Sequence, residues 1–92
     1  MHVFDTRVHV ARKSHQCDTC RGDIRRGESY GRTGVICDGS WVDWVEHHEC
    51  RAEVVRLLRR DREDEYPEGA LAGERWSEED WSPEYAEWRR GR

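Results

Sequence analysis

Apolar and polar residues alternate along positions 3–10, VFDTRVHV, which would place every second side chain on one face: Phe4, Thr6, Val8 and Val10. A period of two predicts a β-strand. Residues 28–47 contain many β-forming residues on both sides of Asp38-Gly39, a dipeptide that supplies the positive φ angles of a tight turn. This second stretch predicts a β-hairpin.

The period changes to that of a helix over residues 49–64, ECRAEVVRLLRRDRED. Apolar residues there form one stripe, with arginines on the other faces: Ala52, Val54, Val55, Leu57 and Leu58. This arrangement predicts an amphipathic helix. Two further helix starts are predicted near the C-terminus, where Ser77 and Asp80 resemble a capping box and Ser82 precedes a proline.

Charge divides the chain into two parts. Residues 1–60 carry eleven Arg/Lys and nine Asp/Glu, a formal +2, whereas residues 61–92 carry five Arg and eleven Asp/Glu, a formal −6. Charge density peaks at residues 60–69, RDREDEYPEG, which also contain a proline and a glycine. We therefore predict a module over residues 1–66 and an acidic tail of short helices over residues 67–92.

The composition bounds the fold and the compartment. The chain has 92 residues, of which 35% are hydrophobic and 39% are charged. A domain this small and polar needs a metal or disulfides as a staple, unless part of it is disordered. The sequence shows neither a signal peptide nor an apolar segment that could cross a bilayer. We therefore expect a cytoplasmic protein, in which paired cysteines bind metal more often than they form disulfides.

Two pairs of cysteine and histidine residues have the spacing of a zinc site. Cys17 and Cys20 flank two residues, so a tight turn would bring both sulfurs to one ion. His47 and Cys50 are three apart, so the first turn of a helix would project them from one face, whereas His48 would point away. We predict one structural Zn²⁺ bound by Cys17, Cys20, His47 and Cys50.

Other interpretations of the cysteines fit less well. Cys37 has no partner at ligand spacing and is interpreted as a free, half-buried thiol. A redox pair usually needs a strand–helix context in a larger α/β fold, which the pattern does not show. A catalytic zinc keeps an open position, whereas four ligands close this site. A metal-dependent nuclease would use groups such as Glu46, His48 and Glu49 but also an asparagine, which the sequence lacks. We therefore expect no enzyme activity.

The motifs CDTCRGDIRRGESY, DGSWVDW and HHEC, with ligands in the order Cys, Cys, His, Cys, lie within residues 12–56. They resemble the zinc finger of the poly(ADP-ribose) polymerase type and short treble-clef proteins of phage or bacterial origin. The resemblance implies a small α+β, zinc-stapled domain of treble-clef type, with a zinc knuckle, a β-hairpin and a helix around the ion. It also implies recognition of DNA ends and breaks.

Basic residues surround the first cysteine pair and the start of the hairpin: Arg12, Lys13, Arg21, Arg25, Arg26 and Arg32. The predicted helix carries others: Arg51, Arg56, Arg59 and Arg60. A surface of this kind favours binding to the phosphates of DNA or RNA, with DNA preferred. The alternative is a solvated face whose charge is neutralised by interspersed acidic residues.

Aromatic residues indicate a second surface. Trp41 and Trp44 are three apart in one predicted strand, so they face opposite sides, and one of them is expected to pack on the helix. The tail contributes Trp76, Trp81, Tyr85 and Trp88. These tail residues either dock on the zinc module and enlarge its core or bind a partner protein. The acidic tail could also cover the basic face and compete with nucleic acid.

The sequence as a whole favours a non-enzymatic zinc module that binds nucleic acid through its arginine face, moderated by the tail. The alternative is a protein-interaction or regulatory module, such as a phage factor that acts on a host protein through the tail and the hairpin. Neither a membrane nor a small-molecule substrate is expected as a partner.

Overall fold

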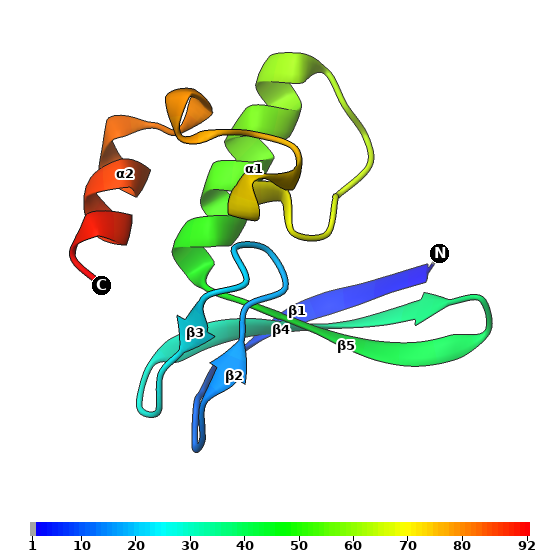
Figure 1. Ribbon diagram of the computed structural model, residues 1–92. Helices are drawn as coiled ribbons and strands as arrows, with labels where there is room; N and C mark the ends of the chain where they lie inside the picture. Colours follow the sequence, from blue (N-terminus) through cyan, green and yellow to red (C-terminus); the bar gives the residue numbers. More distant parts are fainter. Residues whose placement is uncertain (1) are drawn as a thin grey trace.

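A computed structural model describes residues 2–92, except for the side chains of residues 2–5 and of Cys37. It confirms a small α+β domain, in which the helices lie to one side of a three-stranded sheet (Figure 1). The strands of this sheet are antiparallel and follow the order β1 (His2–Val10), β4 (Ser29–Cys37) and β5 (Ser40–Glu46). A separate two-stranded sheet pairs β2 (His15–Gln16) with β3 (Asp23–Ile24).

The predicted strand and the predicted hairpin are both present in the main sheet. Asp38 and Gly39 link β4 to β5 with φ angles of 51° and 80°. An Asp-Gly dipeptide suits this turn because both positions require a positive φ. On β1, Val8 and Val10 are 71% and 64% exposed. The apolar alternation that identified this strand therefore does not lead to burial of its C-terminal half.

The helix α1 (His48–Asp61) ends three residues earlier than the predicted range of 49–64. Arg62 adopts a left-handed φ of 55°, and its N–H group bonds back to the last turn, which ends the helix. The buried residues of α1 lie on one face: Cys50, Glu53, Val54 and Leu57. Ala52 is exposed, contrary to its predicted place on the apolar stripe, because it lies on the opposite side of the helix.

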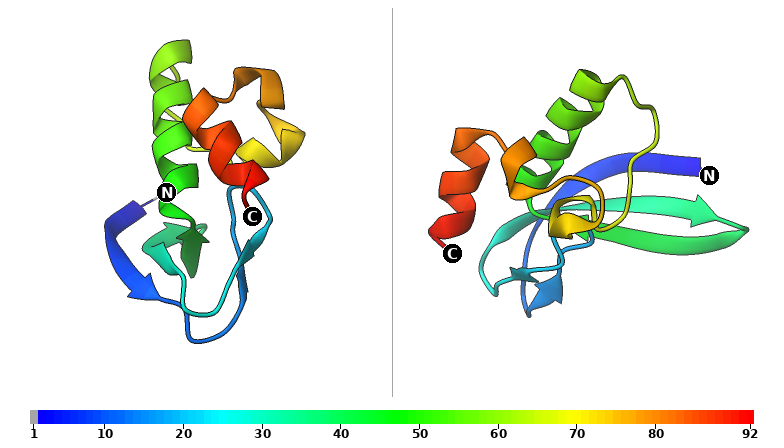
Figure 2. Two further views of the ribbon diagram at one scale, coloured as in Figure 1. Left: turned by 90° about the vertical axis from the view of Figure 1, so that its left-hand side faces the viewer. Right: turned by 45° about the horizontal axis from the view of Figure 1, so that its top comes forward.

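The tail returns along α1 and completes the core. It forms two short turns and a helix: η1 (Ala70–Glu74), η2 (Glu78–Asp80) and α2 (Pro83–Arg90). As predicted, Ser77 and Ser82 cap the starts of η2 and α2. Of the two alternatives left open for the tail, the structure shows the docked one, with α2 beside α1 (Figure 2). Four tail residues are buried in the same cluster as residues of the module: Ala70, Leu71, Trp76 and Tyr85. None of the helices in residues 2–92 is long and apolar enough to cross a membrane.

The segment after α1 also joins the tail to the turn that carries the first two cysteines. The N–H group of Leu71 donates a hydrogen bond to the carbonyl oxygen of Thr19 at 3.0 Å. The N–H group of Gly69 donates to the carbonyl oxygen of Asp18 at 2.8 Å. Trp44, one of the two hairpin tryptophans, packs edge-on against Tyr66 of this segment, with 5.8 Å between ring centroids.

Candidate metal centre

Four side chains from two distant parts of the chain meet at one buried point. Their ligating atoms, three sulfurs and one ring nitrogen, lie within 4.8 Å of one another, and they belong to the predicted set of Cys17, Cys20, His47 and Cys50. Each of the four residues is at most 5% exposed. A closed set of thiol and imidazole donors such as this could hold one metal ion.

The turn between β2 and β3 positions the first two cysteines. The N–H group of Cys17 donates to the carbonyl oxygen of Gly22 at 2.8 Å, and Arg21 donates to that of Cys17 at 2.8 Å. Arg21 has a φ of 61°, so a left-handed residue reverses the chain here. The N–H group of Gly22 then lies 3.4 Å from Cys20 Sγ and favours its thiolate form. Backbone geometry thus directs both sulfurs to one side of the turn.

The start of α1 positions the other two donors. His47 is the last extended residue before the helix, and Cys50 lies in its first turn. His47 Nδ1 is 3.5 Å from the sulfurs of both Cys20 and Cys50, whereas Nε2 is 3.0 Å from the carbonyl oxygen of Asp23. With a metal bound, the Nε2–H group would donate to this carbonyl oxygen and Nδ1 would turn its lone pair to the ion, the usual arrangement of a metal-binding histidine. The ring of His48 bonds to a serine of β4 instead, so it is His47 that lies in the cluster, as predicted.

The four groups also influence one another's protonation. Hydrogen bonding to Cys17 and Cys50 lowers the pKa of Cys20, and hydrogen bonding to Cys17 and Cys20 raises the pKa of Cys50. Burial alone lowers the pKa of His47, but the contacts with Cys17 and Cys20 outweigh it and raise the pKa to about 10. Near neutral pH, His47 and Cys50 therefore hold protons in the metal-free protein, and a bound metal must displace them.

A wholly buried carboxylate, Glu46, links the two halves of the site. It accepts hydrogen bonds from Thr19 Oγ1 and from the Tyr66 hydroxyl, each at 2.6 Å, and from Arg51 at 3.0 Å. Thr19 lies between the first two cysteines, and Glu46 directly precedes His47, so the network couples the positions of both ligand pairs. No local pattern in the sequence indicates this role, because the partners come from three separate segments.

The four aromatic residues predicted to bind a partner pack on the module. Trp76 and Tyr85 are each 4% exposed, and Trp81 and Trp88 are half-buried against the same core. Trp76 Nε1 also donates a hydrogen bond to Asp61 at 2.9 Å. A partner that used these rings would therefore have to displace the tail from α1.

The six basic residues predicted to bind nucleic acid fall into two groups. Arg21 lies 3.2 Å from Glu74 and Arg32 lies 2.6 Å from Asp43, so these two form ion pairs. The other four are exposed, and none of them forms an ion pair with another described residue: Arg12, Lys13, Arg25 and Arg26. We call these four residues the basic end.

Two neighbouring turns carry the basic end. The turn after β3 bonds to the turn after β1 through Gly27, whose N–H group lies 2.7 Å from the carbonyl oxygen of Ala11. The same two turns lie side by side at the bottom of the molecule in Figure 1, on the side away from the helices. The structure therefore brings together charges that are twelve or more residues apart in the sequence.

The cysteines of the metal centre are all free thiols: Cys17, Cys20 and Cys50. Cys37 is placed in β4 by its backbone, but its side chain lies outside the described part of the chain. The half-buried thiol expected there stays a prediction.

No family model, no curated protein and no solved structure matches this chain.

Proposed function

We propose that this protein is a non-enzymatic module in which one structural Zn²⁺ maintains a surface for binding nucleic acid. Three thiolates and one imidazole form a ligand set typical of structural zinc sites. Four protein ligands leave no coordination position for a water or a substrate, which supports a structural rather than a catalytic role. The burial of all four ligands agrees with that role.

The fold around the ion is proposed to be a treble clef, as the resemblance to the poly(ADP-ribose) polymerase-type finger implies. A cysteine turn between two short strands comes first, a β-hairpin follows, and the first turn of a helix supplies the last ligand. This order supports the assignment. The docked tail is the part of the chain that the resemblance does not cover.

The main support for nucleic-acid binding comes from the basic end. Four cations without an ion pair to a described residue lie on two neighbouring turns, in a chain whose formal net charge is −4. A local cluster of this kind produces a positive potential that the net charge does not reveal. The phosphates of a nucleic acid are the natural ligand of such a cluster, and binding to them is strongly dependent on salt.

The acidic tail supports this proposal by neutralising arginines elsewhere. Glu74 pairs with Arg21, and Asp80 pairs with Arg60 of α1, each at 3.2 Å. These acidic residues contact arginines near α1 and the cysteine turn and leave the basic end open. The tail therefore pairs with arginines outside the basic end and leaves the basic end accessible.

Binding of labelled single-stranded DNA, double-stranded DNA and RNA over a range of salt concentrations tests the proposal. Four phosphate contacts on duplex DNA predict that log Kd rises with log salt with a slope of about 3 to 4. The double variant Arg25→Ala/Arg26→Ala should weaken binding and lower this slope by about 2. The control Arg59→Ala/Arg90→Ala removes two exposed arginines from the helices and should leave the slope unchanged. Equal effects of the two variants would reject the basic end as the binding surface.

A protein-interaction role is the second candidate, because the hairpin exposes large apolar side chains. Trp41 is 59% exposed and the neighbouring Val42 is 46% exposed. Apolar surface of this kind at the tip of a sheet fits contact with another protein better than contact with phosphates. If the wild-type chain binds no nucleic acid near physiological salt, this role becomes the better proposal. Trp41→Ser should then abolish capture of the protein partner without loss of metal.

A further inference from the structure

Four side chains at the end of the chain share one helix face. Tyr85, Trp88, Arg89 and Arg92 follow the spacing i, i+3, i+4 and i+7, which places them on the same side of α2 and its C-terminal extension. This face is turned towards the metal centre, and each of the four residues contacts a metal-ligating residue or one of its hydrogen-bond partners. A finger that consists only of a zinc knuckle, a hairpin and one helix has no such second helix over its metal site.

Tyr85 and Trp88 contact the ligands directly. The Tyr85 hydroxyl lies 3.1 Å from Cys50 Sγ. Because the phenol stays protonated, it acts as the donor to a thiolate at this position. The ring of Trp88 packs edge-on against the imidazole of His47, with 5.1 Å between ring centroids. The first contact stabilises charge on a sulfur, and the second fixes the plane of the histidine ring.

Arg89 and Arg92 bring positive charge to the same place. The guanidinium of Arg89 lies beside Gly22 and interacts with Cys20 and Cys50. Arg92 donates to the carbonyl oxygen of Asp23 at 2.9 Å, the same oxygen that accepts from His47 Nε2. Both arginines therefore act on the ligand atoms or on the group that orients them.

The charge of the site explains why such a layer matters. Zinc bound by three thiolates and one neutral imidazole carries a net charge of about −1. Removing that charge from water is unfavourable unless hydrogen-bond donors or cations replace the lost hydration. Tyr85, Arg89 and Arg92 provide this compensation from a segment more than thirty residues beyond the last ligand in the sequence.

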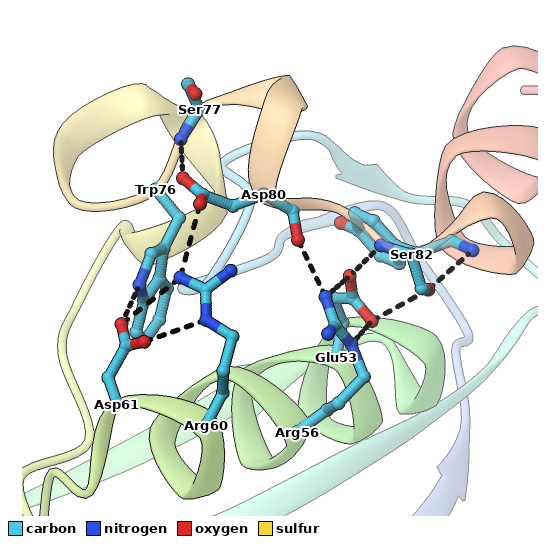
Figure 3. A network of polar contacts seen from close by, with 9 residues as sticks. Glu53, Arg56, Arg60, Asp61, Trp76, Ser77, Asp80 and Ser82 are labelled. Atoms are coloured by element: carbon cyan, nitrogen blue, oxygen red, sulfur yellow. Dashed lines mark hydrogen bonds and ion pairs between the residues drawn. The ribbon is translucent and has the colours of Figure 1, made fainter.

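A second set of contacts fixes α2 in this position (Figure 3). Glu53 of α1 is 4% exposed and accepts hydrogen bonds from the N–H group of Ser82 at 2.6 Å and from its hydroxyl at 2.9 Å. Arg56 binds the same carboxylate at 3.0 Å and also donates to the carbonyl oxygen of Asp80 at 2.7 Å. Ser82 is the N-cap of α2, so this network sets where the helix begins.

We propose that α2 is the outer shell of the metal centre, and that Tyr85 and Arg89 are positioning residues that hold the thiolates and slow the loss of the metal. This inference rests on the proposed zinc site. It assigns the aromatic tail a role in retaining the metal, in addition to its part in the core.

Zinc release from the full-length, zinc-loaded protein tests the inference. Excess chelator with a colour indicator reports the rate at which zinc leaves. Tyr85→Phe removes only the hydroxyl and should speed release about tenfold, because outer-shell contacts typically contribute about 10- to 100-fold to metal affinity. Arg89→Ala should act in the same direction, and Arg89→Lys, which keeps the charge, should restore slow release. In cobalt-loaded protein, Tyr85→Phe should also shift the thiolate-to-metal absorption bands.

Matched controls separate this role from general stability. Tyr30→Phe removes the hydroxyl of a buried tyrosine of β4 whose ring packs against His9 and His15 rather than a ligand, and Arg90→Ala removes the exposed arginine next to Arg89. Both should change zinc release less than about twofold. If Tyr85→Phe and Arg89→Ala release zinc no faster than these controls, the inference is overturned while the zinc site stands. If the wild-type chain takes up no zinc, the proposed zinc site fails and this inference fails with it.

Discussion

The metal end and the hairpin end of this molecule are built in different ways. The metal end comprises the cysteine turn, α1 and the tail, and it buries carboxylates such as Glu46 and Glu53 with their hydrogen-bond donors. The hairpin end, residues 34–43, is held by strand pairing and exposes Trp41 and Val42. A buried polar group is costly without its partner, whereas an exposed one can bond to water. The loss of a single group should therefore matter much more at the metal end.

Loss of one ligand should have the largest effect. Cys50→Ala leaves the site with three ligands, and we expect loss of zinc and unfolding of the metal end. In small structural sites, metal binding supplies on the order of 10 kcal/mol to folding. Circular dichroism during thermal unfolding measures the loss of structure, and atomic absorption measures the zinc content. Cys37→Ala removes a thiol outside the ligand set and should keep one zinc per chain. Loss of zinc in that variant would contradict the assignment.

Protonation of His47 should affect stability with opposite signs in the zinc-bound and the zinc-free protein. Zinc competes with protons for His47 and Cys50, so the zinc-bound form loses stability as pH falls. In the zinc-free form, the pKa of His47 is about 10 against an ordinary 6.5. The stability that this proton provides is therefore complete below pH 6.5 and is lost as pH rises through 10.

A proton count checks the same protonation states. Both His47 and Cys50 hold protons at neutral pH in the zinc-free protein, because both pKa values are raised. Zinc uptake should then release one proton from each, about two in all. Titration calorimetry in buffers of different ionisation enthalpy gives this number. Release of fewer than about two protons would contradict the raised pKa values.

The buried carboxylate of the metal end should matter more than an exposed one of the hairpin end. Glu46→Gln replaces an acceptor with a group that also donates, opposite the hydroxyls of Thr19 and Tyr66. We expect a loss of about 2–3 kcal/mol in the free energy of unfolding, measured by urea denaturation of the zinc-loaded protein. Asp43→Asn breaks the exposed pair with Arg32 and should cost less than about 1 kcal/mol. Equal losses would remove the distinction between the two ends.

A similarly small effect is expected from a close contact within the hairpin. The indole ring of Trp41 lies across Gly34, so close that the Cβ of an alanine at this position would overlap the ring. Gly34→Ala should lift the ring from the sheet at a cost of about 1 kcal/mol, since the exposed indole can move. Tryptophan fluorescence should change while zinc content does not. Loss of zinc in this variant would show that the two ends are coupled.

The sequence by itself determined the ligands and the local elements. The spacing of Cys17 with Cys20 and of His47 with Cys50 fixes each half of the metal centre, because each pair is joined by only a few residues of restricted backbone. Asp38-Gly39 fixes the hairpin turn for the same reason. These features depend on dihedral angles along a short stretch of chain, and a pattern of residues is sufficient to predict them.

Only the tertiary structure decided what the tail faces and which charges are neutralised. The spacing of Tyr85, Trp88 and Arg89 indicates a common helix face, but it does not show that this face meets the ligands. In the same way, nothing near Glu46 in the sequence identifies Thr19 and Tyr66 as its partners. These contacts join residues that are twenty or more positions apart. They depend on the path of the whole chain, which the packing of one small core selects.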